Sequence, residues 1–192
     1  PDTLEAVIER THDNLVSLKH NGQIVERHPL LSGASADQSE SEQLESFLCS
    51  RTLEQLLVLV EGMDDEDLQF VMRGVEFNVK LAEHGMVFHD GLGVGSTLER
   101  LVREGLTSRD MATDARILTS AASDARMAGV KLPAMSSAGS GNHGLTAVLP
   151  IWAARTHLHH ITDTHVLKAI GLSHVVTAYI KAHTGRLSAV CG

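Results

Sequence analysis

Residues 64–85, DDEDLQFVMRGVEFNVKLAEHG, decide the fold class of this chain. The stretch opens with four acidic residues, where the macrodipole of a helix favours negative charge. Apolar residues then recur at helical spacing, at Leu68, Met72, Val75 and Val79. The pattern predicts a helix with one buried face that ends at Gly85.

Helical patterns continue on both sides of this stretch. Before it, apolar residues between Leu44 and Val60 predict helical structure from about residue 42 to a stop at Gly62. After it, Ser96 is the expected N-cap of a helix over 97–104, and Thr107 with Asp110 resembles a capping box. The remaining helices are expected from this box to about Met127, with Gly129 beyond its end, and over 144–155 and 164–183.

The first 41 residues follow a different pattern. Residues 4–27 contain short apolar runs around Asn21-Gly22, a dipeptide that suits the tight turn of a β-hairpin. Residues 28–41 are rich in Ser, Gly, Ala and Asp, which predicts a linker. The fold class is therefore α+β, predominantly α, with an N-terminal β-hairpin followed by a bundle of about six helices. We expect residues 1–41 to form a hairpin segment and linker that belong to a larger α/β region, and residues 42–192 to form a helical domain that is truncated at its C-terminus.

Composition excludes several classes of protein. The formal net charge of −8, with no basic stripe, argues against nucleic-acid binding. Aromatic residues make up only 3%, which favours closely packed helices over a β-sandwich. There is no run of about 18 apolar residues that would predict a membrane span. The two cysteines form no CxxC pattern, so we expect a reducing, cytoplasmic location.

The most informative stretch for function is residues 119–144, TSAASDARMAGVKLPAMSSAGSGNHG. It predicts a helix, then a loop rich in hydroxyls and glycines that leads into the N-terminus of another helix. Such a loop suits a carboxylate or a phosphate, because its glycines allow close approach to backbone N–H groups. A plain interhelical turn capped by Ser and Asn is an alternative, which composition alone slightly favours. A nucleotide-binding module is disfavoured, since no P-loop or G-x-G-x-x-G spacing is present.

Residues 119–144, together with RLSAVC at 186–191, resemble the iron–sulfur L-cysteine desulfidase family (UPF0597), which is related to the alpha chain of bacterial L-serine dehydratase. The resemblance spans nearly the whole chain and is weakest between residues 20 and 90. It implies a β-eliminating lyase that converts L-cysteine to pyruvate, ammonia and hydrogen sulfide. It also implies a [4Fe–4S] cluster whose open iron acts as a Lewis acid. An L-serine dehydratase and a non-catalytic small-molecule-binding or scaffold protein are the alternatives.

The resemblance also implies roles for individual residues. Cys191 matches a family cysteine expected to ligate the cluster, and His12 is a candidate acid or base at a family His-x-Asn position. Cys49 is expected in the core. Arg126 is expected either at the substrate carboxylate or in an ion pair with Asp124. The candidate substrate-binding residues are Arg126, Ser136, Ser137, Gly139, Ser140, Gly141 and Asn142.

Further expectations concern metals and partners. Four histidines and Asp163 between His157 and His165 could bind zinc or nickel, although a polar loop before a capped helix is the simpler interpretation. The family's other cluster cysteines have no counterpart here, so we expect an internal fragment that is inactive alone. We expect the remainder of its own polypeptide, or a second chain, to complete the fold, including the helical domain. The expected ligand is an amino acid, and self-association stays open.

Overall fold

The computed structural model describes residues 2–8, 15–26, 28 and 37–184, the last range with side chains from residue 43 onward. Three strands come first, β1 (Leu4–Ile8), β2 (Leu15–His20) and β3 (Gln23–Ile24). Seven helices follow in the described part, so the mainly α expectation is confirmed. They are α1 (Asp37–Cys49), α2 (Leu53–Glu61), α3 (Asp65–Phe88), α4 (Val94–Arg103), α5 (Met111–Met127), α6 (Gly141–Ala154) and α7 (Asp163–Thr184).

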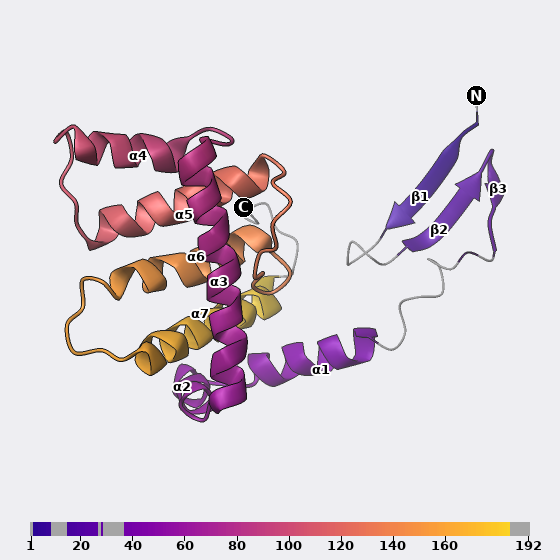
Figure 1. Ribbon diagram of the computed structural model, residues 1–192. Helices are drawn as coiled ribbons and strands as arrows, with labels where there is room; N and C mark the ends of the chain where they lie inside the picture. Colours follow the sequence, from indigo (N-terminus) through magenta and orange to yellow (C-terminus); the bar gives the residue numbers. More distant parts are fainter. Residues whose placement is uncertain (1, 9–14, 27, 29–36, 185–192) are drawn as a thin grey trace.

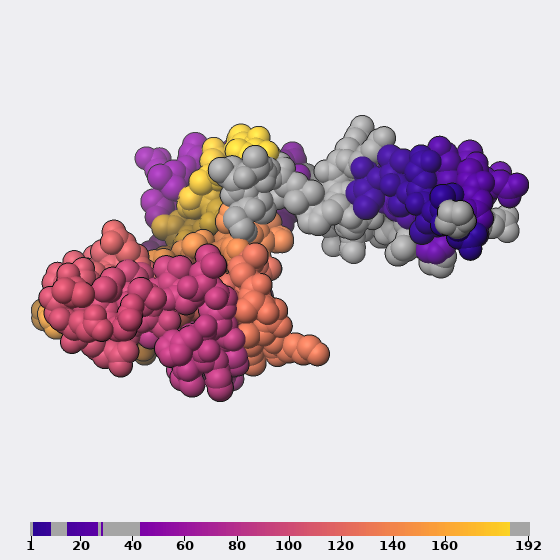
Figure 2. Space-filling model, turned by 90° about the horizontal axis from the view of Figure 1, so that it is seen from above, coloured from indigo at the N-terminus to yellow at the C-terminus, as the bar shows by residue number. Residues whose placement is uncertain are grey.

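The strands form one antiparallel sheet in the order β1-β2-β3. Asn21 and Gly22 lie between β2 and β3 with φ of 51° and 78°, as a type I′ turn requires, so the predicted hairpin is confirmed. The sheet lies beside the helical domain, and no contact between described elements joins the two (Figures 1 and 2). The helical domain therefore carries the large apolar core.

Helix α3 organises that core. It runs across α4, α5, α6 and α7 and contacts each of them (Figure 1). Its first half packs against α6 and α7, where Val75 is 1% exposed and Ile170 is fully buried. Its second half packs against α5 and α6 through Leu81 and Leu145, both fully buried. Each buried side chain of this size contributes about 1.5–3 kcal/mol to stability.

The chain has few large aromatic side chains to fill its core, and neighbouring helices instead pack with their backbones close together. A Cβ at Gly85 would overlap the carbonyl oxygen of Ala121 on α5, so α3 and α5 are nearly in backbone contact there. The prediction that Gly85 ends the helix was therefore wrong. The helix continues to Phe88 and ends at His89, whose φ of 54° is left-handed.

Several predicted helix boundaries also needed correction. The first helix begins at Asp37, inside the predicted linker, and a break at residues 50–52 separates it from α2. Thr52 then starts α2 with a complete capping box, a signal that the continuous apolar pattern concealed. Gly93 rather than Ser96 is the N-cap of α4, and Asp110 rather than Thr107 caps α5.

Candidate functional site

The Ser/Gly loop between α5 and α6 closes in a tight turn. The Ser137 N–H donates to Ser140 O at 2.9 Å, and the Ser140 N–H donates to Ser137 O at 3.0 Å. Between them, Ala138 and Gly139 have φ of 45° and 80°, so both adopt the left-handed region of a type I′ turn. The loop is thus a miniature hairpin placed directly before α6.

Two serine hydroxyls of this turn lie at the N-terminus of α6. Ser140 is the N-cap, and its Oγ accepts a hydrogen bond from the His143 N–H at 3.3 Å. Residues that face each other across an antiparallel bridge project their side chains to the same side. The Ser137 side chain therefore lies on the same side of the turn as that of Ser140. Ser137 is 2% exposed, and its Oγ has no hydrogen-bond partner within the described chain. A buried hydroxyl without a partner is costly, and a bound ligand would relieve that cost. Ser136, by contrast, is exposed.

Arg126 connects the end of α5 to the start of α6. Its Nη1 donates to Asn142 Oδ1 at 2.9 Å, and its guanidinium occupies the space that a Cβ at Gly141 would need. The alternative ion pair with Asp124 does not form, because the Asp124 carboxylate is buried and accepts a hydrogen bond from the Gly95 N–H at 3.2 Å. Within the described ranges, no carboxylate forms an ion pair with Arg126.

Two buried polar residues, neither among the sequence-predicted site residues, hold the loop from other helices. Asn78 on α3 is fully buried, accepts from the Met135 N–H at 2.9 Å and donates to Gly144 O at 3.3 Å. Lys181 on α7 is 6% exposed, and its Nζ donates to Ala138 O at 3.3 Å. The only signal in the sequence was a polar residue on an otherwise apolar helix face. This signal does not predict which distant group the polar residue will contact.

The electrostatics of this region favour a small anion. The N-terminus of α6 carries the positive end of a helix dipole. The guanidinium of Arg126 lies on its first residue, and the ammonium of Lys181 contacts the adjoining turn. Arginine presents parallel N–H donors that match a carboxylate. The structure therefore brings Arg126, Ser137, Ser140, Gly141 and Asn142 together, with Gly139 in the turn between the serines.

Two predicted site residues, His12 and Cys191, lie outside the described residues. The prediction for Cys49 was wrong: its side chain is exposed at the end of α1, with Sγ 3.8 Å from His183 Nδ1. The apolar pattern around it failed because the described end of α1 packs only in part, with Leu48 buried and its neighbours on either side exposed.

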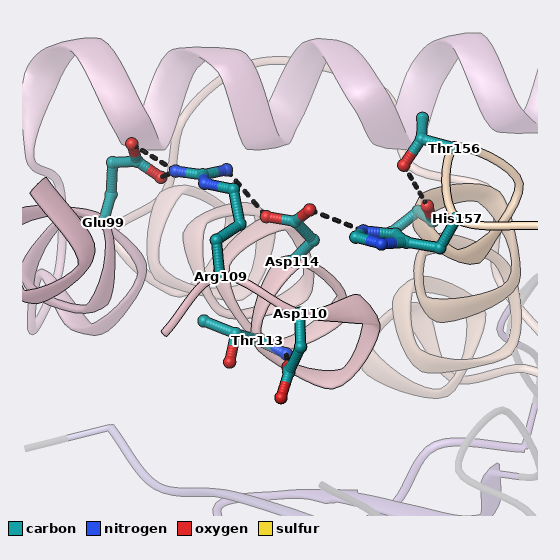
Figure 3. A network of polar contacts seen from close by, with 8 residues as sticks. Glu99, Arg109, Asp110, Thr113, Asp114, Thr156 and His157 are labelled. Carbon is teal, nitrogen blue, oxygen red and sulfur yellow. Dashed lines mark hydrogen bonds and ion pairs between the residues drawn. The ribbon is translucent and has the colours of Figure 1, made fainter. Parts of the chain in front are cut away.

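The histidines within residues 157–165 do not form a metal site in the part of the chain that the structure describes. His157 turns towards α5, with Nε2 2.7 Å from Asp114 Oδ2, while His165 contacts Thr162 at the start of α7. Asp114 also pairs with Arg109 at 2.7 Å, and Arg109 pairs with Glu99 on α4 (Figure 3). The hydrogen bond that the Arg109 guanidinium donates to the Glu99 carboxylate is the main cause of a raised pKa of Arg109. This network joins α4, α5 and the α6–α7 connection.

The half-buried His174 on α7 gives a testable pH dependence of stability. Burial lowers its pKa below the ordinary 6.5, and its Nε2 has no hydrogen-bond partner among the residues that the structure describes. Below pH 6.5 the unfolded chain binds a proton that the folded chain resists, so the free energy of unfolding falls with pH until the folded pKa is reached. One proton limits this slope to about 1.4 kcal/mol per pH unit. Urea unfolding between pH 8 and 5 should show the loss in the wild type and less of it in His174→Gln. The exposed His159→Gln is the control, and equal slopes in all three proteins would contradict the assignment.

Fold and site together define a mainly helical domain with a cationic Ser/Gly loop between two helices. Among the described residues, no helix is long and apolar enough to cross a membrane. The sequence profile of the serine dehydratase alpha chain family matches residues 27–192. The chain belongs to this family.

Curated relatives support the same assignment. A UPF0597 protein of Desulfatibacillum aliphaticivorans is 54% identical over 98% of this chain, and one of Desulfotalea psychrophila is 51% identical over 98%. A third, from Clostridioides difficile, is 44% identical over 96%. The chain spans 43% of the length of each of these relatives. No solved structure matches the chain.

Proposed function

We propose that this domain belongs to a β-eliminating lyase and binds the carboxylate of its amino-acid substrate. The substrate that we propose first is L-cysteine. One observation carries the proposal: the Arg126 guanidinium lies against Gly141 and Asn142 at a helix N-terminus, with no carboxylate paired to it in the described chain. An amino-acid carboxylate would supply the missing negative charge and accept its hydrogen bonds.

The loop residues divide the work of binding. Arg126 and the first-turn N–H groups of α6 bind the carboxylate. The Ser137 hydroxyl, which has no hydrogen-bond partner among the described residues, donates to the same group. Asn142 fixes the guanidinium plane through its Oδ1 and leaves the other guanidinium donors for the ligand. Holding the carboxylate in this way orients the α-carbon for removal of its proton.

The reaction then needs two further groups: a base that removes the α-proton, and a group that stabilises the departing thiolate or hydroxide. A base removes the α-proton, and the Cα–H electron pair forms the Cα–Cβ double bond as the leaving group departs from Cβ. The resulting aminoacrylate converts to an imine and hydrolyses to pyruvate and ammonia. His12 is our candidate for an acid or base, from its sequence position alone. The leaving group is sulfide from L-cysteine or hydroxide from L-serine.

The cluster implied by the family resemblance needs three or four cysteine thiolates. The described residues contain one cysteine, Cys49, which is exposed beside His183, so they do not by themselves fit a [4Fe–4S] cluster. We propose that Cys191 supplies one thiolate and that the others come from the rest of the full-length protein.

The test uses the full-length protein that contains this chain. It is purified without oxygen, reconstituted with iron and sulfide, and assayed for pyruvate and sulfide release from L-cysteine and for pyruvate from L-serine. We expect release of sulfide and pyruvate in equal amounts from L-cysteine. In Cys191→Ala, loss of one thiolate should abolish both turnover and the iron–sulfur absorbance, whereas Cys49→Ala should change neither. A full iron content in Cys191→Ala would contradict its proposed role.

Two other functions are separate outcomes of this experiment. Preferential turnover of L-serine would favour a serine dehydratase, a reading that the matched family supports. Binding of an amino acid without turnover or cluster would favour a non-catalytic small-molecule-binding protein.

A further inference from the structure

Asn78 occupies an unusual position in helix α3. It is fully buried and lies on the face that also carries Val75 and Leu81. A buried amide in such surroundings is costly unless both of its ends are hydrogen-bonded. Both ends are bonded here, and neither partner belongs to α3: Oδ1 accepts from Met135 N and Nδ2 donates to Gly144 O.

These two partners mark the entrance and the exit of the Ser/Gly loop. Met135 directly precedes the serines, and Gly144 lies in the first turn of α6. The two segments also touch each other, since a Cβ at Gly144 would come within 2.7 Å of the Ser136 Cα. One side chain on a third helix thus fastens both ends of the loop at a single point. The Met135 side chain packs on α3 one turn earlier, where a Cβ at Gly74 would lie 2.8 Å from its Cγ.

We propose that Asn78 is the positioning residue of the amino-acid-binding loop. Its amide fixes the separation of Met135 and Gly144, and this separation aims the hydroxyls of Ser137 and Ser140 at the site beside Arg126. An apolar residue of similar size could fill the same volume, but it would leave the Met135 N–H and the Gly144 carbonyl without this partner. Packing alone therefore does not explain an amide at this position. The inference rests on the proposed function for the loop's ligand, but not for the loop's conformation.

Two variants of the full-length protein test the role. Asn78→Leu keeps the approximate volume and removes both hydrogen bonds. Asn78→Asp keeps the acceptor for Met135 N, and it regains a donor for Gly144 O only when its carboxyl group is protonated. Val75→Ala is the matched control, because it creates a cavity in the same helix, 1% exposed, without a polar contact to the loop.

Amide hydrogen exchange gives a readout that does not depend on catalysis. In Asn78→Leu, amides of residues 135–144 should exchange roughly tenfold or more faster relative to the α3 and α7 amides, as the loss of the two hydrogen bonds predicts. Val75→Ala should speed exchange across the core without this local excess. In Asn78→Asp the local excess should be present at pH 8.5 and smaller at pH 6, where protonation restores the donor.

Kinetics add a second readout. If the wild-type protein turns over an amino acid, Asn78→Leu should raise KM by roughly tenfold while Val75→Ala leaves KM unchanged. A loop that exchanges no faster than the rest of the domain in both Asn78 variants would overturn the inference. If no amino acid is turned over, the proposed function fails, but hydrogen exchange still decides whether Asn78 positions the loop. If Asn78→Leu does not fold, Asn78→Asp at the two pH values decides it.

Discussion

Arg126→Leu in the full-length protein is expected to raise KM for the amino-acid substrate by roughly 100-fold, since a charge-assisted pair with a carboxylate is worth about 1.5–3 kcal/mol. The guanidinium lies on Gly141, the first residue of α6. At this N-terminus, the free backbone N–H groups and the helix dipole also favour an anion. Leucine removes the charge but keeps most of the apolar stem, so the effect should be on binding rather than folding. Steady-state kinetics, with a urea unfolding curve beside them, measure both.

Two further variants make the Arg126 result specific. Arg126→Lys keeps the charge but loses the planar pair of donors, so an intermediate KM is expected. Arg116→Leu removes an exposed arginine from the same helix and should leave KM unchanged. An unchanged KM in Arg126→Leu would show that the substrate carboxylate is bound elsewhere, and the proposed site would then be wrong.

Gly144→Ala is expected to destabilise the domain by about 3 kcal/mol, the upper part of the range for overpacking a core. A Cβ there would overlap the Met135 carbonyl oxygen and come within 2.7 Å of the Ser136 Cα. Both are backbone atoms of a loop that Asn78 fastens to α3, so they cannot move as a flexible side chain would. Helix α6 cannot retreat easily either, because the next residue, Leu145, is fully buried.

Urea unfolding measures this loss, and Gly62→Ala is the matched control. Gly62 has φ of −79° at the end of α2, and its new Cβ would meet nothing nearer than the Leu59 carbonyl oxygen at 3.4 Å. A shift of less than about 1 kcal/mol is expected there. The same midpoint in Gly144→Ala as in the wild type would mean that the loop does not pack on α6 as described.

Local signals in the sequence predicted most secondary structure. Asn21-Gly22 produced the hairpin because both residues tolerate positive φ. Asp64 began α3 because its carboxylate accepts hydrogen bonds from the Glu66 and Asp67 N–H groups. Both effects act within three residues of the chain. Where a local signal had a non-local use, as at Gly85, the prediction failed.

The candidate site also has features that local sequence predicted and features that only the packing of helices decided. From the sequence alone, the Ser/Gly loop, its place before a helix N-terminus and the family resemblance could be identified, because these depend on neighbouring residues. Only the tertiary structure decided that Arg126 reaches Asn142 rather than Asp124, and that the loop is fastened by Asn78 and Lys181. The bonds of Asn78 span 57 and 66 residues, and the bond of Lys181 spans 43. Periodicity reports which face of a helix is buried, but the packing of whole helices decides which distant group each buried polar atom meets.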